Sequence, residues 1–227
     1  MNEPALLSSI EIETQPNPDA AVIWMHGLGD SGYGWSSEVG SLGLPSTARI
    51  RFLFPNAPTM PITVNQGYRM PAWYDVAGSD LSARVDLKGI RASQERIEAL
   101  LRNEYSRGIA PSRMVLAGFS QGGAVALYAG LRHSERLAGV VALSTYLVGA
   151  ETLEQEASEA NRQMPVFMAH GTVDPVVLPH WGEMSRDALR ERHYEVEWQT
   201  YPMPHSATEQ ELLDVGVFLA RVLPALG

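Results

Sequence analysis

The sequence predicts an α/β domain with a mostly parallel central sheet and helices on both of its faces. Short apolar runs alternate with helical patterns along the chain, which is typical of such a sheet. The length of 227 residues suits a single hydrophobic core. The chain also contains no internal repeat, low-complexity tract or linker-like stretch. We therefore expect a single domain over residues 1–227.

The expected strands are short apolar or β-rich runs that end at glycine or proline. Ala20–His26 is too short for a typical helix and is followed by glycine, so it predicts a buried strand. Pro55 and Pro202 stop two of the later runs. In chain order, the runs are Ala20–His26, Ile50–Phe54, Met114–Ala117, Ala138–Leu143, Val166–Ala169 and Val196–Tyr201. The earlier segment Ile10–Glu13 predicts an antiparallel edge strand.

The expected helices lie between and after these strands. Apolar residues from Leu87 to Tyr105 recur at helical spacing, and Gly108 follows as a stop. Residues 121–131 are small and apolar, as expected of a helix packed on a sheet. Further helical patterns are Glu151–Asn161, Trp181–Arg192 and Thr208–Leu223. Because ligands of such sheets bind at the carboxyl ends of the strands, the residues directly after each strand are the candidate functional residues.

The composition excludes several classes of protein. A count of 17 basic against 26 acidic residues gives a net charge of −9, which argues against a nucleic-acid or anionic-membrane partner. The lack of cysteine excludes a disulfide framework, a thiolate nucleophile and a thiolate metal site. Met1–Gln15 has neither the basic flank nor the apolar run of a signal peptide, so we expect a cytoplasmic protein. Met114–Leu131 is apolar, but its polar residues and four glycines predict a strand, a turn and a helix, not a membrane span.

The run Gly118–Gly122 has the pattern Gly-x-Ser-x-Gly, typical of a nucleophile elbow. Ser120 would lie on a strained turn between strand and helix, with its hydroxyl projecting into the site. Glycine on either side leaves room for the backbones that crowd such a turn. The positive end of the following helix favours developing negative charge. A Gly-rich turn produces the pattern by chance as well, but the strand–turn–helix context favours the catalytic serine of an α/β-hydrolase fold.

A serine hydroxyl is a weak nucleophile, so it needs a base and an acid that orients the base. In this fold the acid follows the serine along the chain, and the histidine base follows the acid. Asp174 is the only downstream aspartate that directly follows a strand, although an aspartate before proline is also a common turn residue. His205 lies between the last strand and the last helix. The other histidines precede Ser120 or Asp174, or lie on or beside helices. We therefore predict Ser120, Asp174 and His205 as the catalytic triad.

The oxyanion that forms when the serine attacks needs backbone N–H donors. One is expected from Gln121, directly after the serine, and the other from Leu28, in the loop after an early strand. In that position the Leu28 side chain would face the acyl group.

The same loop, Gly27–Gly32, also matches the G-x-G-x-x-G fingerprint of dinucleotide-binding domains. That fingerprint requires an acidic residue about 20 residues further on, at the end of the next strand. No Asp or Glu occurs between Glu38 and Asp75. Arg49 and Arg51 would suit a phosphorylated ribose, so the cofactor hypothesis is weakened and not excluded.

Six segments together make the chain resemble the phospholipase/carboxylesterase family of α/β-hydrolases, whose members include acyl-protein thioesterases and small bacterial carboxylesterases. They are HGLGD at His26–Asp30, FPNAP at Phe54–Pro58, MPAWYD at Met70–Asp75, GFSQGG at Gly118–Gly123, GTVDPVV at Gly171–Val177 and the segment Tyr201–Ser206. The resemblance covers almost the whole chain. It implies the same triad, and Leu28 and Gln121 as oxyanion donors. Acyl transfer by these residues needs no metal or organic cofactor. One departure is Pro204, because the family usually has glycine before the catalytic histidine.

The substrate is predicted from the connection Met60–Trp73, which is long, apolar and rich in proline. It is either a structural loop folded over the sheet or a wall of the acyl pocket, with Leu28, Met70 and Trp73 as candidate wall residues. The fold uses nearly all of the chain and leaves no room for a large lid domain. We therefore expect a serine carboxylesterase for small- to medium-chain esters.

Three alternatives remain at this point. The resemblance also allows an acyl-protein thioesterase or lysophospholipase. A catalytically dead binding module is disfavoured because all of the expected site residues are present. The dinucleotide-binding protein is the third. Apolar groups around residues 60–73 are compatible with a homodimer.

Overall fold

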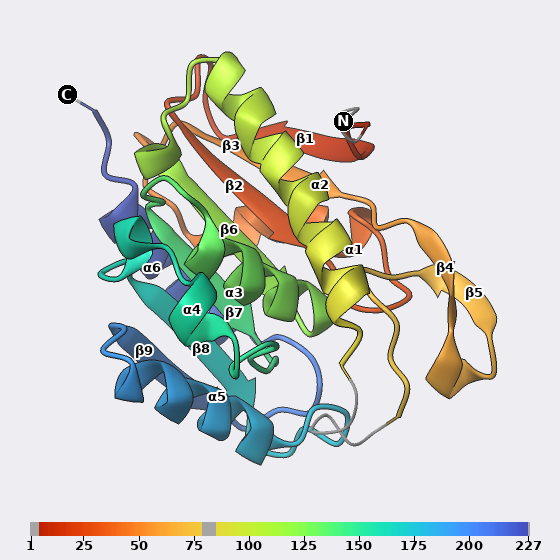
Figure 1. Ribbon diagram of the computed structural model, residues 1–227. Helices are drawn as coiled ribbons and strands as arrows, with labels where there is room; N and C mark the ends of the chain where they lie inside the picture. The colour runs from red at the N-terminus through yellow and green to blue at the C-terminus, as the bar shows by residue number, and fades with distance from the viewer. Residues whose placement is uncertain (1–4, 79–84, 227) are drawn as a thin grey trace.

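The computed structural model describes residues 5–78 and 85–226. A twisted sheet runs through the middle of the molecule, with helices on both sides (Figure 1). Its strands are β1 (Ser9–Glu13), β2 (Ala20–Met25), β3 (Ile50–Pro55), β6 (Met114–Phe119), β7 (Gly139–Leu143), β8 (Val166–Gly171) and β9 (Val196–Tyr201). The expected α/β-hydrolase fold is confirmed, and the expected strands differ from these by at most two residues at either end.

The sheet has seven strands in the order β1-β3-β2-β6-β7-β8-β9. Only the edge strand β1 runs antiparallel to its neighbour, with Ile10 opposite Phe54, as the sequence predicts. The other neighbours pair in parallel. The strands β2, β6, β8 and β9 therefore end at one edge of the sheet, and the residues that follow them are brought together.

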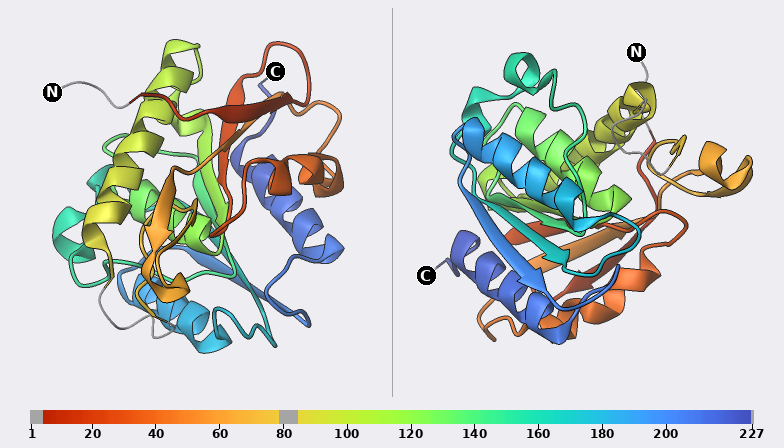
Figure 2. Two further views of the ribbon diagram at one scale, coloured as in Figure 1. Left: turned by 90° about the vertical axis from the view of Figure 1, so that its right-hand side faces the viewer. Right: turned by 90° about the horizontal axis from the view of Figure 1, so that it is seen from below.

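Two apolar cores lie on the two faces of the sheet, because successive residues of each buried strand point to opposite faces. In β2, Ile23 belongs to one core and Trp24 to the other. The helices α2 (Leu87–Ser106), α3 (Gln121–Arg132) and α5 (Pro179–Glu191) cover the first face. The helix α6 (Glu209–Val222), with the short helix α1 (Tyr33–Ser36) and the 3-10 segment η1 (Ser37–Leu42), covers the second (Figure 2).

The helix expected over Glu151–Asn161 is wrong as a continuous element. The structure has a short helix, α4 (Leu153–Glu156), and a separate 3-10 turn, η4 (Glu159–Asn161), with extended backbone at Ala157 between them. Tertiary hydrogen bonds explain the break. The N–H of Ser158 donates to the carbonyl of Leu131 on α3, at 2.9 Å. The side chain of Asn161 also bonds to the backbone of residues 133, 135 and 137.

The connection that was expected as a loop over Met60–Trp73 contains a β-hairpin. Its strands β4 (Thr59–Ile62) and β5 (Tyr68–Pro71) form a separate two-stranded sheet. The hairpin projects from the side of the molecule (Figure 1). Two residues with positive φ at its tip, Gln66 and Gly67, close the turn.

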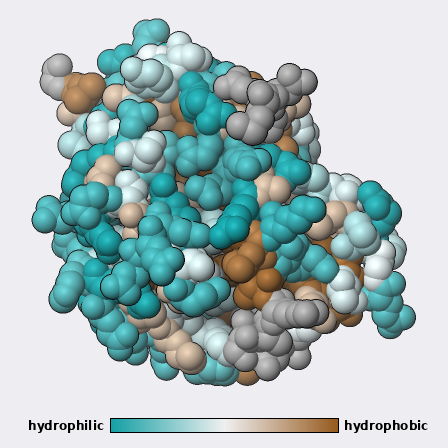
Figure 3. All heavy atoms as spheres, viewed as in Figure 1, coloured by the Kyte–Doolittle hydropathy of each residue, from teal (hydrophilic) through white to brown (hydrophobic). Residues whose placement is uncertain are grey.

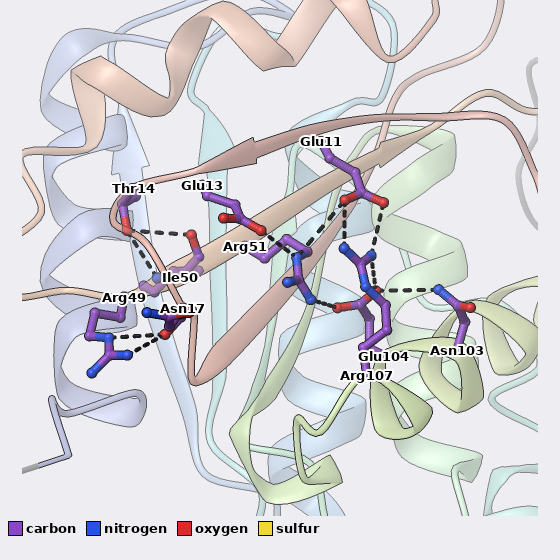
Figure 4. A network of polar contacts seen from close by, with 10 residues as sticks. All are labelled: Glu11, Glu13, Thr14, Asn17, Arg49, Ile50, Arg51, Asn103, Glu104 and Arg107. Carbon is purple, nitrogen blue, oxygen red and sulfur yellow. Dashed lines mark hydrogen bonds and ion pairs between the residues drawn. The ribbon is translucent and has the colours of Figure 1, made fainter.

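A cluster of ion pairs fastens the edge strand to the body of the molecule (Figure 4). Glu104 of α2 has a fully buried side chain and pairs with Arg51 of β3 at 2.8 Å and with Arg107 at 2.7 Å. Arg107 also pairs with Glu11 of β1 at 2.9 Å, and this hydrogen bond is the main cause of the lowered pKa of Glu11. Arg51 pairs in addition with Glu13 at 3.0 Å. The cluster therefore joins β1, β3 and α2.

Candidate active site

Ser120 lies on a tight turn between β6 and α3, with φ 53° and ψ −120°. This conformation is strained for a residue with a side chain. A Cβ on Gly118 would collide with the backbone of Gly122, and a Cβ on Gly122 would collide with the backbone of Met25 at the end of β2. The two glycines that the pattern predicts are therefore required by the close approach of three backbone segments.

Hydrogen bonds to β7, to the loop after it and within α3 hold this turn. The N–H of Ser120 donates to the carbonyl of Leu143 at 2.8 Å. The carbonyl of Ser120 accepts from the hydroxyl of Thr145 at 2.6 Å and from the N–H of Ala124 at 3.1 Å. The backbone of the strained residue is thus fixed on both sides, at its N–H and at its carbonyl.

Asp174 and His205 form the second part of the site. Nδ1 of His205 lies 2.6 Å from Oδ2 of Asp174, whose side chain is fully buried. The other carboxylate oxygen, Oδ1, accepts from the N–H groups of Val176 and Val177 at 2.8 and 3.0 Å. Because a carboxylate only accepts, the proton of the imidazole lies on Nδ1, and Nε2 is left free to act as a base.

His170, the neighbouring histidine, supports the acid loop. Its Nε2 donates to the carbonyl of Val177 at 2.8 Å and lies 3.5 Å from Oδ2 of Asp174. Burial lowers the pKa of His170, so the ring stays neutral at neutral pH. It fixes the loop between β8 and α5 in which Asp174 lies.

Pro204 does not move His205 away from its partner. The loop after β9 packs against the end of β8, where a Cβ on Gly171 would collide with the carbonyls of Met203 and Pro204. The ring of His205 also lies against Phe119, with 4.7 Å between the ring centroids. The imidazole is therefore held between the acid loop and the turn that carries Ser120.

The two expected oxyanion donors lie at this same edge of the sheet. Within the described ranges, the backbone N–H groups of Leu28 and Gln121 have no hydrogen-bond partner. The N–H of Gln121 is free because the first residues of a helix have no partner within it. The loop that carries Leu28 turns at Gly29, whose φ is 80°.

A cavity of about 1080 Å³ contains the candidate residues Ser120, His205, Leu28 and Gln121 in its wall. Apolar side chains from the hairpin region, the β7 loop and the β8 loop line one part of it: Val64, Val76, Tyr146, Val176 and Val177. The residues from η1 and the start of α6 are more polar and include Glu38, Ser41, Thr208 and Glu209. On the face seen in Figure 3, apolar atoms gather toward the side of the hairpin while most of the surface is hydrophilic.

Of the three residues predicted for the pocket wall, Leu28 alone is among those that line the cavity. Met70 and Trp73 are not among the residues that line the cavity. Trp73 is buried, with 1% of its surface exposed, because its indole N–H donates to the carbonyl of His26 beneath the site. Tyr146 and Val176 line the cavity and were missed. Both lie in loops that directly follow strands, so the rule that selected the triad would also have selected them.

The G-x-G-x-x-G segment does not open the long helix that a dinucleotide site needs. The helix that follows Gly32, α1, has four residues and leads into a 3-10 turn. Without a regular helix N-terminus, the pyrophosphate site of the fingerprint is missing. The described part of the chain also contains no group of acidic or histidine side chains that could hold a metal ion. None of its helices is long and apolar enough to cross a bilayer.

Comparison with known proteins agrees with this architecture. The family model described as Phospholipase/Carboxylesterase matches residues 8–223. The chain is 42% identical over 214 residues to acyl-protein thioesterase 1 of Gibberella zeae, a match that covers 90% of this chain and 91% of that one. The crystal structure of Zea mays acyl-protein thioesterase 2 is 30% identical, with a TM-score of 0.83 over 95% of this chain and 99% of that one. Arabidopsis thaliana SOBER1 is 28% identical, with a TM-score of 0.85 over 90% of this chain and 99% of that one. The protein is a hydrolase that belongs to the phospholipase/carboxylesterase family.

Proposed function

We propose that this protein is a serine thioesterase that removes acyl groups from acylated proteins, and that it also cleaves carboxylic esters of similar chain length. The observation that carries the proposal is that Ser120, His205 and two unpartnered N–H groups line one large, partly apolar cavity. At about 1080 Å³ the cavity is slightly larger than most small-molecule sites, which span roughly 300–1,000 Å³. A cavity of this size favours a long acyl group over an acetate.

The chemistry is acyl transfer in two steps. Nε2 of His205 takes the proton of the Ser120 hydroxyl as its oxygen attacks the carbonyl carbon. The N–H groups of Leu28 and Gln121 donate to the resulting oxyanion. His205 then gives the proton to the leaving thiol or alcohol, and an acyl ester on Ser120 remains. Water, deprotonated by His205, attacks this ester, and the acid leaves as Ser120 regains its proton.

The similarity to acyl-protein thioesterases supports the thioesterase over the small-ester carboxylesterase that the sequence alone predicts. The two functions differ in the leaving group and in chain length. A dedicated small-ester enzyme would prefer acetate and butyrate esters, whereas a thioesterase would prefer a long chain on a peptide cysteine.

Hydrolysis of p-nitrophenyl esters from acetate to palmitate, beside an S-palmitoylated peptide, tests the proposal. We expect kcat/KM to rise with chain length and the peptide to be deacylated. Ser120→Ala is expected to retain the fold and lose both activities, because no other nucleophile is present at the turn. A peak at acetate without peptide hydrolysis would favour the carboxylesterase, and substantial turnover by Ser120→Ala would refute the nucleophile.

A further inference from the structure

The segment Pro71–Tyr74, which begins at the last residue of β5, is bonded to both halves of the proposed oxyanion hole. We call the loop His26–Asp30, which carries the Leu28 N–H, the first arm. The turn Gly118–Gly122, which carries the Gln121 N–H, is the second arm. The ladder between β2 and β6 ends at the pair Met25 and Gly118, before either donor is reached. Among the described residues, no hydrogen bond joins the two arms beyond that pair.

Trp73 is bonded to both arms. Its indole N–H donates to the carbonyl of His26 in the first arm at 2.8 Å. Its backbone N–H donates to Oε1 of Gln121 in the second arm, also at 2.8 Å. Its own carbonyl accepts a short hydrogen bond from the hydroxyl of Ser93 on α2. Trp73 is thus anchored to a long helix while it holds both arms.

The side chain of Gln121 completes the link. Its Nε2 donates to the carbonyl of Tyr74 at 2.7 Å, so both ends of this buried amide are bonded to consecutive residues of the segment. A further bond holds the first arm, because the N–H of Gly29 donates to the carbonyl of Pro71 at 2.8 Å. Gln121 therefore has two separate parts: a backbone N–H without a partner among the described residues, and a side chain that is bonded to Trp73 and Tyr74.

The imidazole of His26 stiffens the first arm at the point where Trp73 holds it. Its Nε2 accepts from the N–H of Ala57 at 3.1 Å, and its Nδ1 donates to the carbonyl of Gly27 at 2.7 Å. Burial lowers the pKa of His26, which keeps the ring in this neutral form. The carbonyl that Trp73 contacts therefore belongs to a residue that is itself fixed.

We propose that Trp73 and the side chain of Gln121 are positioning residues that set the distance between the Leu28 and Gln121 N–H donors. The inference rests on the proposed function, because it assigns the two N–H groups to an oxyanion. Oxyanion stabilisation depends on donors placed within a fraction of an ångström, and small displacements have large effects on rate. We call Trp73 and the side chain of Gln121 the brace. Loosening the brace is expected to leave substrate binding intact and to weaken only the hydrogen bonds that form in the transition state.

The first test exchanges the indole for a ring without an N–H. Trp73→Phe keeps an apolar ring and removes the donor to the His26 carbonyl. Trp24→Phe is the matched control, because Trp24 is equally buried and its indole N–H has no partner. We expect kcat on the preferred p-nitrophenyl ester to fall roughly 10- to 100-fold in Trp73→Phe, with KM changed by less than about threefold. Trp24→Phe is expected to keep kcat within about threefold.

A transition-state analogue gives a second readout. A trifluoromethyl ketone with the same acyl chain is attacked by Ser120 and places an oxyanion between the two donors. Its inhibition constant is expected to weaken by the same factor as kcat in Trp73→Phe. A merely structural role would lower the melting temperature and leave both quantities unchanged in the folded enzyme.

Gln121→Glu tests the brace independently of the indole. One oxygen of the carboxylate still accepts from the Trp73 N–H. The other oxygen replaces the amide N–H₂ that donated to the Tyr74 carbonyl, so two acceptors face each other there. Protonation restores a donor, so we expect the ratio of the variant's kcat to that of the wild type to rise as the pH falls. A ratio independent of pH would overturn the role of this side chain.

The outcomes distinguish a failure of the positioning role from a failure of the proposed function. Equal losses in Trp73→Phe and Trp24→Phe, or an unchanged kcat in Trp73→Phe beside an active wild type, would overturn the brace alone. A folded wild-type protein that hydrolyses no ester or thioester would overturn the proposed function, and the brace with it. A loss of kcat specific to Trp73→Phe, matched by the ketone, supports both.

Discussion

At the scale of single residues, Asp174 decides which nitrogen of His205 is free to act as a base. Its two oxygens are used by different partners, Oδ2 by the imidazole and Oδ1 by two backbone N–H groups. In Asp174→Asn the amide oxygen is expected to stay with the backbone N–H groups, which turns the amide N–H₂ toward His205. The imidazole must then accept at Nδ1, which places its proton on Nε2 and blocks the base.

We therefore expect Asp174→Asn to fold and to lose about 10⁴-fold in kcat, the loss that the same exchange causes in serine proteases. Steady-state hydrolysis of a p-nitrophenyl ester, beside a melting curve, measures both. Asp187→Asn is the control, because Asp187 is an exposed residue of α5 paired with Arg186. A variant of Asp174 that keeps a tenth of the wild-type rate would contradict the orienting role.

The residues of the site differ in how far the sequence could locate them. Asp174 and His205 were predicted from their order along the chain and from their places after strands, and the structure brings them into contact. Trp73 was predicted as a pocket wall because it lies in the long, apolar and proline-rich connection over residues 60–73. Its direction is set by the carbonyl of His26, which is 47 residues away in sequence. No local pattern carries that information.

At the scale of elements, the attachment of the edge strand depends on a buried carboxylate. Glu104 of α2 pairs with two arginines that also bind the carboxylates of β1. Removing its charge leaves Arg51 and Arg107 partly buried, with only the carboxylates of Glu11 and Glu13 as ion-pair partners. Breaking a buried pair by removing one partner costs about 3–5 kcal/mol, and we expect the lower end here because Glu11 and Glu13 remain.

Urea denaturation of Glu104→Gln is expected to show an unfolding free energy lower by roughly 3 kcal/mol, with kcat unchanged because none of these residues lines the cavity. Glu154→Gln, on the exposed surface of α4, is the control and is expected to stay within about 0.5 kcal/mol of the wild type. An unfolding free energy equal to that of the wild type would show that the attraction between these charges only offsets the cost of burying them.

Helices and strands could be predicted where a local sequence pattern determines them. They could not be predicted where hydrogen bonds between distant segments determine the backbone conformation. The buried strands follow from short apolar runs, and the long helix α2 follows from its periodicity. The helix expected over Glu151–Asn161 is broken because Ser158 and Asn161 bond to other segments. The hairpin β4–β5 was missed because its strands have only four residues each and carry prolines.

At the scale of the whole molecule, parallel order is what assembles the site. Leu28, Ser120, Asp174 and His205 follow β2, β6, β8 and β9, so a sheet in which these strands run the same way brings them to one edge. The sequence predicted this edge. The shape of the cavity was not predictable, because its wall combines the hairpin region, two loops, η1 and α6, and the packing between them is set only in the folded chain.

Global stability should also depend on pH through one buried carboxyl group, that of Glu211 in the first turn of α6. The side chain is fully buried and its oxygens have no partner among the described residues. Burial, reinforced by the nearby charge of Asp214, raises the pKa of Glu211 to about 8. In the unfolded chain the group titrates near its ordinary value of about 4.3.

Between about pH 4.5 and pH 8 the folded protein therefore holds a proton that the unfolded chain has lost. The contribution of this group to stability is largest below this window. It falls as the pH rises through the window, by about 5 kcal/mol in all. The buried histidines act in the opposite direction, because burial lowers the pKa values of His26 and His170. Comparing Glu211→Gln with the wild type at each pH removes the contribution of these histidines, because both proteins contain them.

We expect Glu211→Gln to gain stability over the wild type progressively from pH 5 to pH 9, since an amide needs no proton to be neutral. Urea unfolding at each pH measures the difference, and Glu209→Gln, an exposed neighbour on the same helix, is expected to follow the wild type. Parallel curves for Glu211→Gln and the wild type would show that the carboxyl group titrates normally in the fold. A widening gap would mean that α6, which begins beside the candidate site, is packed most stably when this carboxyl is protonated.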